Sequence, residues 1–128
     1  MAFISLGLSG DTGGLYYLEK LLGVGRMTDL MMTGRPLDGI EAEKLGVARL
    51  VEEEKLEEDT LKFAKKMANG PLFAYKTQKE IFNELFFNDM DKVFALEAQG
   101  MYETSRSQDF KEAVDAFLNR RRPNFKGR

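Results

Sequence analysis

The chain has 128 residues, 43% of them hydrophobic and 31% charged, with a formal net charge of −2. This composition is typical of one soluble globular domain, and the slightly acidic balance gives no support for nucleic-acid or anionic-membrane binding. Because cysteine and histidine are both absent, disulfides, thiolate or histidine zinc sites and the usual serine and cysteine triads are excluded, so acid–base chemistry must use Asp, Glu, Lys or Tyr.

The first third of the chain predicts one short strand and three short helices. Residues 3–8 form an apolar run that predicts a buried strand, although Gly7 weakens it. Asp11 and Thr12 then open a helix, which Gly23 to Gly25 stop. Residues 26–33 predict a second helix that ends at Gly34. Asp38 is a suitable N-cap for a third helix, over residues 39–45, with Gly46 just past its end.

The remainder predicts one more short strand and then only helices. Residues 47–51 are β-like. Four helices follow, with inward apolar positions expected at Leu56, Thr60, Phe63 and Met67; at Tyr75, Phe82, Leu85 and Phe86; at Val93, Phe94, Leu96 and Met101; and at Phe110, Val114 and Phe117. Asn69-Gly70-Pro71 and Asn88-Asp89 separate these helices, and Ser107 caps the last one. We therefore predict a mainly α fold with one or two short strands.

Two isolated strands do not make a stable sheet, so we expect them to join a sheet supplied from elsewhere. The chain also enters its first predicted strand almost directly after Met1. Both features suggest part of a larger fold. No apolar run approaches the ~20 residues of a membrane span, and the N-terminus lacks signal-peptide features. We expect a cytoplasmic protein without membrane association or a metal site.

The stretch Ser9-Gly10-Asp11-Thr12-Gly13-Gly14 carries the most chemistry. Asp11 is either a helix N-cap or an acid–base group that the glycines bring close to a ligand, and the two roles do not exclude each other. A phosphate cradle is disfavoured, because the stretch lacks the Lys-Ser/Thr of a P-loop and the Gly-x-Gly-x-x-Gly spacing.

Three stretches, in this order, resemble one known family: "LGLSGDTGGLYYLEKLLG", "MMTGRPLDGIEAEKLGVARLV" and the terminal "NFKGR". Together they are similar to the C-terminal half of the crotonase superfamily, the enoyl-CoA hydratase/isomerase enzymes, over essentially all of residues 1–128. The resemblance implies the C-terminal part of an α/β spiral fold. It also implies an acyl-CoA thioester as substrate, no cofactor beyond the CoA of that substrate, and a homo-oligomer, trimeric or hexameric. The family's N-terminal half supplies two backbone N–H groups that form an oxyanion hole.

The resemblance also assigns roles to residues. Hydratases of the family carry a glutamate in a Pro-Glu pair where this chain has Ala2-Phe3, so Phe3 replaces that glutamate and lies at the substrate. Isomerases carry an acid at the glycine-rich turn, which Asp11 matches, although Gly10 stands in place of the usual proline. Asp11 is thus the expected catalytic base, and Tyr16 is expected to line the acyl pocket. The alternative for Tyr16 is an ordinary, partly buried helix tyrosine.

The last nine residues carry five cations, and Phe125 and Lys126 lie among them. One explanation is a helix C-terminus that favours positive charge. The resemblance implies instead that Phe125 contacts the adenine and Lys126 the 3′-phosphate of CoA. We expect the chain to be part of an enzyme that acts through a thioester enolate, more isomerase than hydratase, and inactive without the N-terminal half. The alternative is a non-catalytic helical oligomerisation module.

Overall fold

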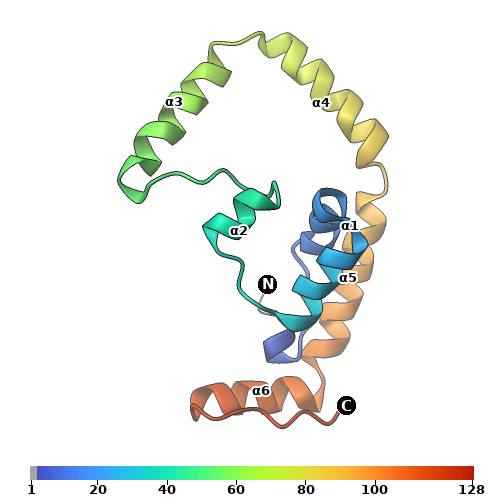
Figure 1. Cartoon of the computed structure of the whole chain (residues 1–128). Helices are drawn as coiled ribbons and strands as arrows, with labels where there is room; N and C mark the ends of the chain where they lie inside the picture. The colour runs from blue at the N-terminus through green and yellow to red at the C-terminus, as the bar shows by residue number, and fades with distance from the viewer. Residues whose placement is uncertain (1–2) are drawn as a thin grey trace. The chain divides into compact units, whose positions relative to one another are not determined.

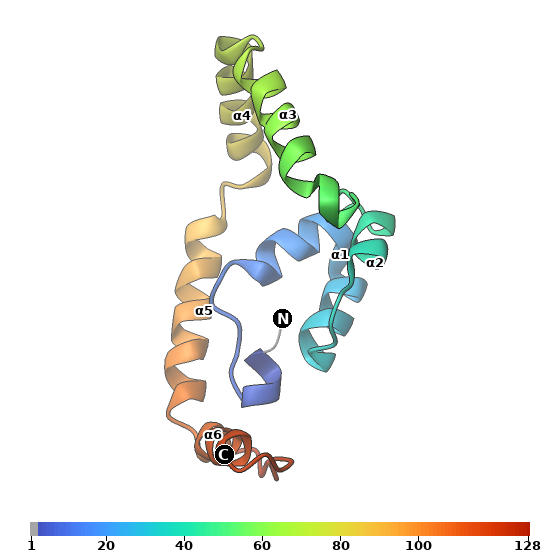
Figure 2. The same ribbon diagram turned by 90° about the vertical axis from the view of Figure 1, so that its left-hand side faces the viewer.

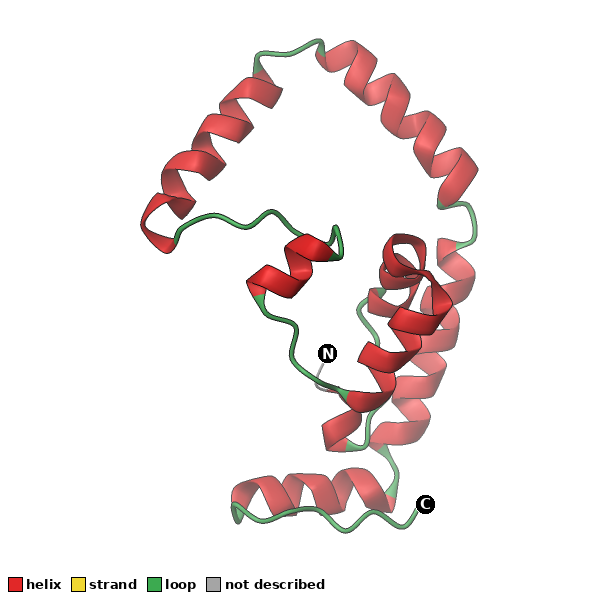
Figure 3. Cartoon of the chain, viewed as in Figure 1, coloured by secondary structure: helices red, strands yellow, loops and turns green. Residues whose placement is uncertain are grey.

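The computed structural model describes residues 3–128, and every regular element in that range is helical (Figure 3). The prediction of a mainly α chain is confirmed. The two predicted strands are wrong: residues 3–6 form a 3₁₀ helix and residues 47–51 have no regular structure. A strand needs a neighbouring strand to satisfy its backbone groups, and the described residues provide none.

The N-terminal segment satisfies its own hydrogen bonds instead. The helix η1 (Phe3–Leu6) is followed by a tight turn in which the Gly7 N–H donates to the Ile4 carbonyl and the Leu8 N–H to the Phe3 carbonyl, both at 3.0 Å. Gly7 has a φ of 68°, a left-handed conformation that glycine adopts without strain. The glycine that weakened the strand prediction therefore marks the turn.

Helix α1 (Gly14–Thr33) is interrupted at Gly23, which has φ 74° and ψ 160°. It ends at Gly34, a left-handed C-cap whose N–H donates to the Leu30 carbonyl at 3.1 Å. The break predicted at Gly23 and the end predicted at Gly34 are both confirmed. Each depends on a glycine that adopts a conformation unfavourable for other residues.

The chain divides into two compact units (Figure 1). The first unit contains the chain up to Asp38 together with Met90–Arg128, and the second is Gly39–Asp89. The first unit therefore brings together η1, α1 and two C-terminal helices, α5 (Met90–Ser105) and α6 (Gln108–Leu118). Figure 2 shows the segment between η1 and α1 running along α5.

Helix α6 begins where its cap residue predicts. The Ser107 hydroxyl accepts a hydrogen bond from the Phe110 N–H at 2.9 Å. The predicted inward stripe is wrong at its end, because Val114 and Phe117 are exposed while Ala113 and Ala116 are nearly fully buried. The small side chains allow the neighbouring elements to approach this face closely. The other buried apolar residues described in this unit are Tyr16, Met27 and Leu30.

The second unit contains α2 (Gly39–Lys44), η2 (Glu53–Lys55), α3 (Leu56–Ala68) and α4 (Leu72–Phe86). Helix α2 ends one residue before its predicted limit, and α3 ends and α4 begins at the break predicted over residues 69–71. The short 3₁₀ turn η2 was not predicted. Within the described residues, α3 and α4 contain no buried side chain. The apolar positions predicted to face inward on α4 are exposed: Tyr75, Phe82, Leu85 and Phe86. Both helices thus have apolar faces that the described part of the chain leaves uncovered.

Candidate active site

The glycine-rich turn in the first unit depends on Gly13. Gly13 is the N-cap residue of α1 and has a φ of 70°. A Cβ added there would lie 2.8 Å from Cε1 of Phe94 on α5. Gly13 is therefore required both by its backbone conformation and by the closeness of a neighbouring helix.

Asp11 lies exposed on this turn, two residues before Gly13. Helix α1 begins at Gly14, and its N-cap makes no side-chain hydrogen bond. The prediction that Asp11 and Thr12 open the helix, with Asp11 as its cap, is therefore wrong. No hydrogen bond or ion pair of the Asp11 carboxylate is present within residues 3–128, so this acid has no structural partner there.

Glu97 takes the place of the missing cap from a distant part of the chain. Its Oε2 accepts a hydrogen bond from the Gly13 N–H at 2.8 Å, across 84 residues of sequence. The Glu97 side chain is buried, and its Oε1 has no hydrogen-bond partner among the described residues. A carboxylate at the N-terminus of a helix is favoured by the helix dipole.

The start of the turn is also attached to α5. The Ser9 N–H donates to Oγ1 of Thr104 at 3.2 Å, and the two hydroxyl oxygens lie 3.4 Å apart. Thr104 Oγ1 donates in turn to the Gly100 carbonyl at 2.8 Å. Asp11 thus lies in the middle of a segment whose two ends are both bonded to one helix.

Sequence reasoning did not identify Glu97 or Thr104. A signal was present: Val93, Glu97 and Thr104 fall on one face of α5, so a charged residue stands on a face that is otherwise apolar or small. A charged residue on such a face needs a partner. The partner is a backbone N–H 84 residues away, which periodicity within one helix does not reveal.

Phe3 and Tyr16, the two residues expected to line the substrate site near the N-terminus, lie in η1 and α1. Phe3 is half-buried in η1 rather than on a strand, and Ala2, which precedes it in the compared pair, lies outside the described residues. Tyr16 is only 4% exposed. Its ring lies 5.6 Å from that of Tyr17 in an edge-to-face arrangement, and the Lys20 Nζ lies 4.5 Å from its centroid. Tyr16 is packed inside the first unit; a substrate contact for it stays a prediction.

The C-terminal tail folds back along α6 (Figure 1). Arg121 pairs with Glu112 and Asp115, and the Asn124 N–H donates to Glu112 Oε1 at 2.8 Å. The hydrogen bond from Arg121, followed by that from Asn124, lowers the pKa of Glu112 to about 2. The same carboxylates favour the charged guanidinium and raise the pKa of Arg121 above its ordinary value.

Phe125 and Lys126 lie at the far end of this tail. The N–H groups of Lys126 and Gly127 each donate to a carboxylate oxygen of Asp109 at 2.7 Å, so the backbone is fixed at Lys126. Phe125 lines a cavity of about 940 Å³ whose wall also includes Ile4, Ser9, Met32 and Thr104. The structure thus brings the tail aromatic to the same cavity as the start of the glycine-rich turn. Asp11, Tyr16 and Lys126 do not line this cavity.

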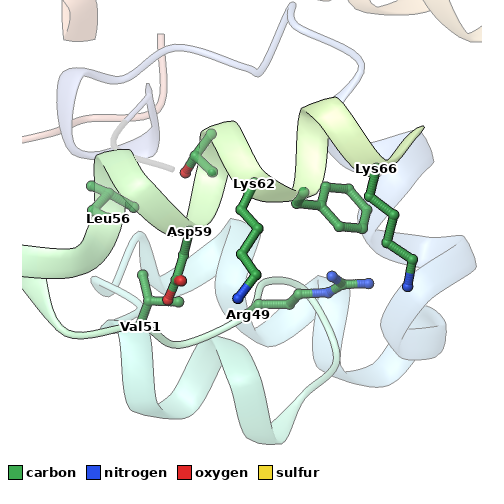
Figure 4. A pocket seen from close by; sticks show the side chains of 8 residues that line it. Arg49, Val51, Leu56, Asp59, Lys62 and Lys66 are labelled. Carbon is green, nitrogen blue, oxygen red and sulfur yellow. The ribbon is translucent and has the colours of Figure 1, made fainter. Parts of the chain in front are cut away.

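The second unit contains a basic groove that the sequence did not reveal (Figure 4). Lys62 and Lys66 extend from α3 toward Arg49, and the three cations share a cavity of about 730 Å³ with a single acid, Asp59. The Arg49 guanidinium carbon lies 4.5 Å from the centroid of the Phe63 ring. Aromatic and cationic groups in this arrangement suit an anion or a planar ring system.

Two further features bear on the kind of site. Within residues 3–128, no cluster of three or more acidic, histidine or cysteine side chains is arranged to hold a metal ion. None of the helices in this range is both long enough and apolar enough to cross a bilayer.

Similarity to solved structures defines the class of protein. The chain matches an enoyl-CoA hydratase from Mycobacterium avium subsp. paratuberculosis K-10 with a TM-score of 0.92, at 27% identity, over 98% of this chain and 52% of that one. It matches an enoyl-CoA hydratase/isomerase from Pseudoalteromonas atlantica T6c with a TM-score of 0.89, at 29% identity, over 97% and 50%. The helices are therefore those of a crotonase-fold protein.

The sequence comparisons give the family. The family model described as Enoyl-CoA hydratase/isomerase matches residues 1–128, and the chain belongs to this family. It is 34% identical to a trans-2-decenoyl-(acyl-carrier-protein) isomerase of Streptococcus mutans over 99% of this chain, and 33% identical to a 1,2-epoxyphenylacetyl-CoA isomerase of Escherichia coli over all of it. A probable enoyl-CoA hydratase of Rhodobacter capsulatus is 32% identical.

The chain spans about half the length of the curated relatives it matches, 49% for both isomerases. This coverage fits the C-terminal half that the sequence motifs predict. The names of the relatives include isomerases as well as hydratases, so family membership leaves the reaction to be argued from the residues.

Proposed function

We propose that this chain is the base-bearing half of an enzyme that moves the double bond of an enoyl thioester, with the Asp11 carboxylate as the base. The observation that carries the proposal is the state of Asp11. It is exposed, without a hydrogen-bond or ion-pair partner within residues 3–128, on a turn whose glycines let backbone and ligand approach closely. Within the described residues this acid caps no helix and forms no ion pair, so its carboxylate is available for chemistry.

The proposed reaction is a proton transfer in two steps. The Asp11 carboxylate removes a proton from the carbon next to the thioester carbonyl, and the electron pair of that C–H bond delocalises into a dienolate. The protonated Asp11 then returns the proton to the far end of the dienolate, so the double bond moves by one position and no proton is gained or lost. The difficult intermediate is the negative oxygen, which needs fixed N–H donors. By resemblance to the family, those donors belong to the N-terminal half, so the chain alone is inactive.

Isomerisation is preferred over hydration because of Phe3. Hydration of the family type uses a carboxylate at that position to activate water, and a phenyl ring has no group that takes up a proton. The hydratase relatives make hydration the competing assignment. An assay that follows double-bond migration and water addition on the same substrate separates the two.

The thioester substrate carries its acyl group on either CoA or an acyl carrier protein. The Streptococcus mutans relative is named for an acyl-carrier-protein thioester and the Escherichia coli relative for a CoA thioester. CoA carries an adenine and a 3′-phosphate, for which Phe125 and Lys126 offer a ring and an ammonium group. We therefore assign CoA as the carrier. Equal rates with matched CoA and carrier-protein thioesters would speak against this choice.

A helical oligomerisation module is the alternative function. Exposed apolar side chains on α3 and α4, such as Phe73 at 82% and Leu72 at 59%, favour a surface that meets another protein chain. The two functions are compatible in one protein, but only the enzyme needs Asp11.

The experiment that tests the enzyme assignment compares Asp11→Asn with Asp91→Asn, in the chain combined with a family N-terminal half. Asp91 is an exposed acid in the first turn of α5 and serves as the control. Asparagine retains an oxygen acceptor but loses the basicity, so Asp11→Asn lowers kcat by about 10²-fold or more while Asp91→Asn does not. Equal kcat values for the two variants would remove Asp11 from the mechanism.

A further inference from the structure

We propose that Glu97 and Thr104 of α5 are positioning residues for Asp11. They hold the two ends of the segment Ser9–Gly13, which is here called the turn segment, and so fix the direction of the acid at its centre. The inference rests on the proposed function of Asp11 and goes beyond it, because it assigns a role to a helix remote in sequence. Neither residue is proposed to touch the substrate.

The distance between the two attachment points restricts the turn segment to few conformations. Glu97 and Thr104 are seven residues apart on α5, and at 1.5 Å per residue their anchoring groups are separated by roughly 10.5 Å along the helix. They bind the N–H groups of Gly13 and Ser9, at 2.8 and 3.2 Å. Four residues of fully extended chain reach at most about 13–14 Å. A segment of that length between such anchors has few conformations, and Asp11 lies at its midpoint.

The glycines next to these attachments keep the turn segment against its neighbours. A Cβ at Gly100 would lie 3.0 Å from Ser9 Oγ, and one at Gly13 would lie 2.8 Å from Phe94 Cε1. On the other side, a Cβ at Gly10 would lie 3.2 Å from the terminal methyl of Met31. The turn segment is therefore confined by packing as well as by hydrogen bonds.

The burial of Glu97 is the second, independent observation. Its side chain is only 9% exposed, and Oε1 has no partner among the described residues. A buried carboxylate with one unsatisfied oxygen is unfavourable in a site that serves packing alone. Among the described residues, its side chain accepts one hydrogen bond, from the N-cap of α1, so its contribution is to the placement of the turn segment.

Fixed placement of a base matters because proton abstraction needs a narrow geometry. A displacement of about 1 Å at a reacting group lowers the rate by roughly 10²-fold. Removing one of two anchors lets the turn segment sample other conformations without changing Asp11 itself. We therefore expect Glu97→Ala to lower kcat about 10- to 100-fold with little change in KM, because substrate binding does not use this carboxylate.

The test is a double-mutant cycle, in the chain combined with a family N-terminal half. Glu97→Ala is measured in the wild-type and in the Asp11→Asn background, with Glu84→Ala, an exposed glutamate on α4, as the control. If Glu97 acts through Asp11, its kcat loss disappears when Asp11 is already Asn. A loss of equal size in both backgrounds means that Glu97 only supports packing, and it overturns the proposal.

If the Glu97→Ala protein does not fold, more conservative substitutions at positions 97 and 104 test the same positioning role. Glu97→Gln retains an oxygen acceptor for the Gly13 N–H and is expected to retain more activity than Glu97→Ala. Thr104→Val removes the hydroxyl at nearly constant shape, whereas Thr104→Ser keeps it and is expected to retain kcat. Activity that is the same in the Val and Ser variants at position 104 contradicts the proposal.

Amide exchange on the full 128-residue chain gives a readout that does not depend on turnover. Loss of the Glu97 carboxylate is expected to speed exchange at the Gly13 N–H, and unchanged exchange overturns the proposal.

Failure of the proposed function and failure of the positioning role give different results. An Asp11→Asn protein with normal turnover defeats the proposed function, whereas a Glu97→Ala protein with normal turnover beside an inactive Asp11→Asn protein defeats the positioning role alone.

Discussion

Alanine substitution at three glycines separates the contributions that fix the turn before α1. Gly13 has a left-handed φ of 70° and lies against Phe94. Gly23 has a left-handed φ of 74° but no neighbouring atom within 4 Å of an added Cβ. Gly25 lies in α1 without a left-handed φ and is also in open space. The three sites therefore differ in backbone strain and in steric contact.

The expected magnitudes follow from these differences. A non-glycine residue in the left-handed region costs roughly 1–2 kcal/mol. Pushing the Phe94 ring aside from a 2.8 Å contact adds about 1–3 kcal/mol of overpacking. Reduced freedom of the unfolded chain returns about 0.4–1 kcal/mol at each site. We therefore expect Gly13→Ala to lower the free energy of unfolding by about 2–4 kcal/mol, Gly23→Ala by about 1 kcal/mol, and Gly25→Ala to raise it by about 0.5–1 kcal/mol.

Urea unfolding of the purified chain, followed by far-ultraviolet circular dichroism at one fixed protein concentration, measures all three values. The double variant Gly13→Ala with Phe94→Ala serves as the control, because it removes the steric contact and leaves the strain. The reasoning is refuted if Gly13→Ala is no more destabilising than Gly23→Ala.

Three further outcomes are expected. Lys126→Ala raises KM for a CoA thioester with kcat unchanged, because the 3′-phosphate lies far from the reacting carbon; an equal effect on the dephospho-CoA thioester contradicts the assignment. The purified chain self-associates through the uncovered faces of α3 and α4, and a monomer by light scattering at high micromolar concentration contradicts this. The pKa of Glu112 is lowered from its ordinary 4.5 to about 2. The hydrogen bonds by which its carboxylate holds the tail are therefore fully present above pH 4.5 and are lost as the pH falls toward 2. Glu112→Gln should abolish that pH dependence in tail proteolysis, and an unchanged pH profile would count against it.

The helix boundaries were the most predictable part of the fold, because local chemistry decides them. Ser107 supplies a cap oxygen, Gly34 adopts the left-handed conformation, and Gly23 breaks the helix, each independently of distant contacts. The break at Asn69-Gly70-Pro71 was likewise predictable, although the helices on either side of it contain no buried residue within the described chain.

The strands and several inward-facing residues could not be predicted in this way, because they depend on partners. Residues 3–8 have the composition of a strand, but no strand in the described residues is available to pair with them. The sequence of α4 carries an apolar stripe, but no element of the described chain packs against it. On α6 the face that packs closely is the one with Ala113 and Ala116, because small side chains allow the approach.

The candidate site was predictable only in part. Asp11 was identified from its turn, but of its two possible roles the helix cap is wrong. The left-handed Gly13 occupies the cap position, and its N–H donates to the Glu97 carboxylate. That contact joins residues 84 apart, and no local pattern specifies it. Roles carried over from the family for Phe3, Tyr16, Phe125 and Lys126 stay predictions for the kinetic assays.

The central claim is that Asp11 acts as a base only when oxyanion donors are supplied by another half of the protein. The most direct test measures double-bond migration in a short enoyl-CoA, first with the purified 128-residue chain and then after addition of a separately made family N-terminal half. Losing a single oxyanion donor lowers the rate by roughly 10²- to 10³-fold, and losing both lowers it further. We expect no measurable turnover by the chain alone and clear turnover by the mixture. Turnover by the chain alone at a rate near that of the mixture would contradict the account.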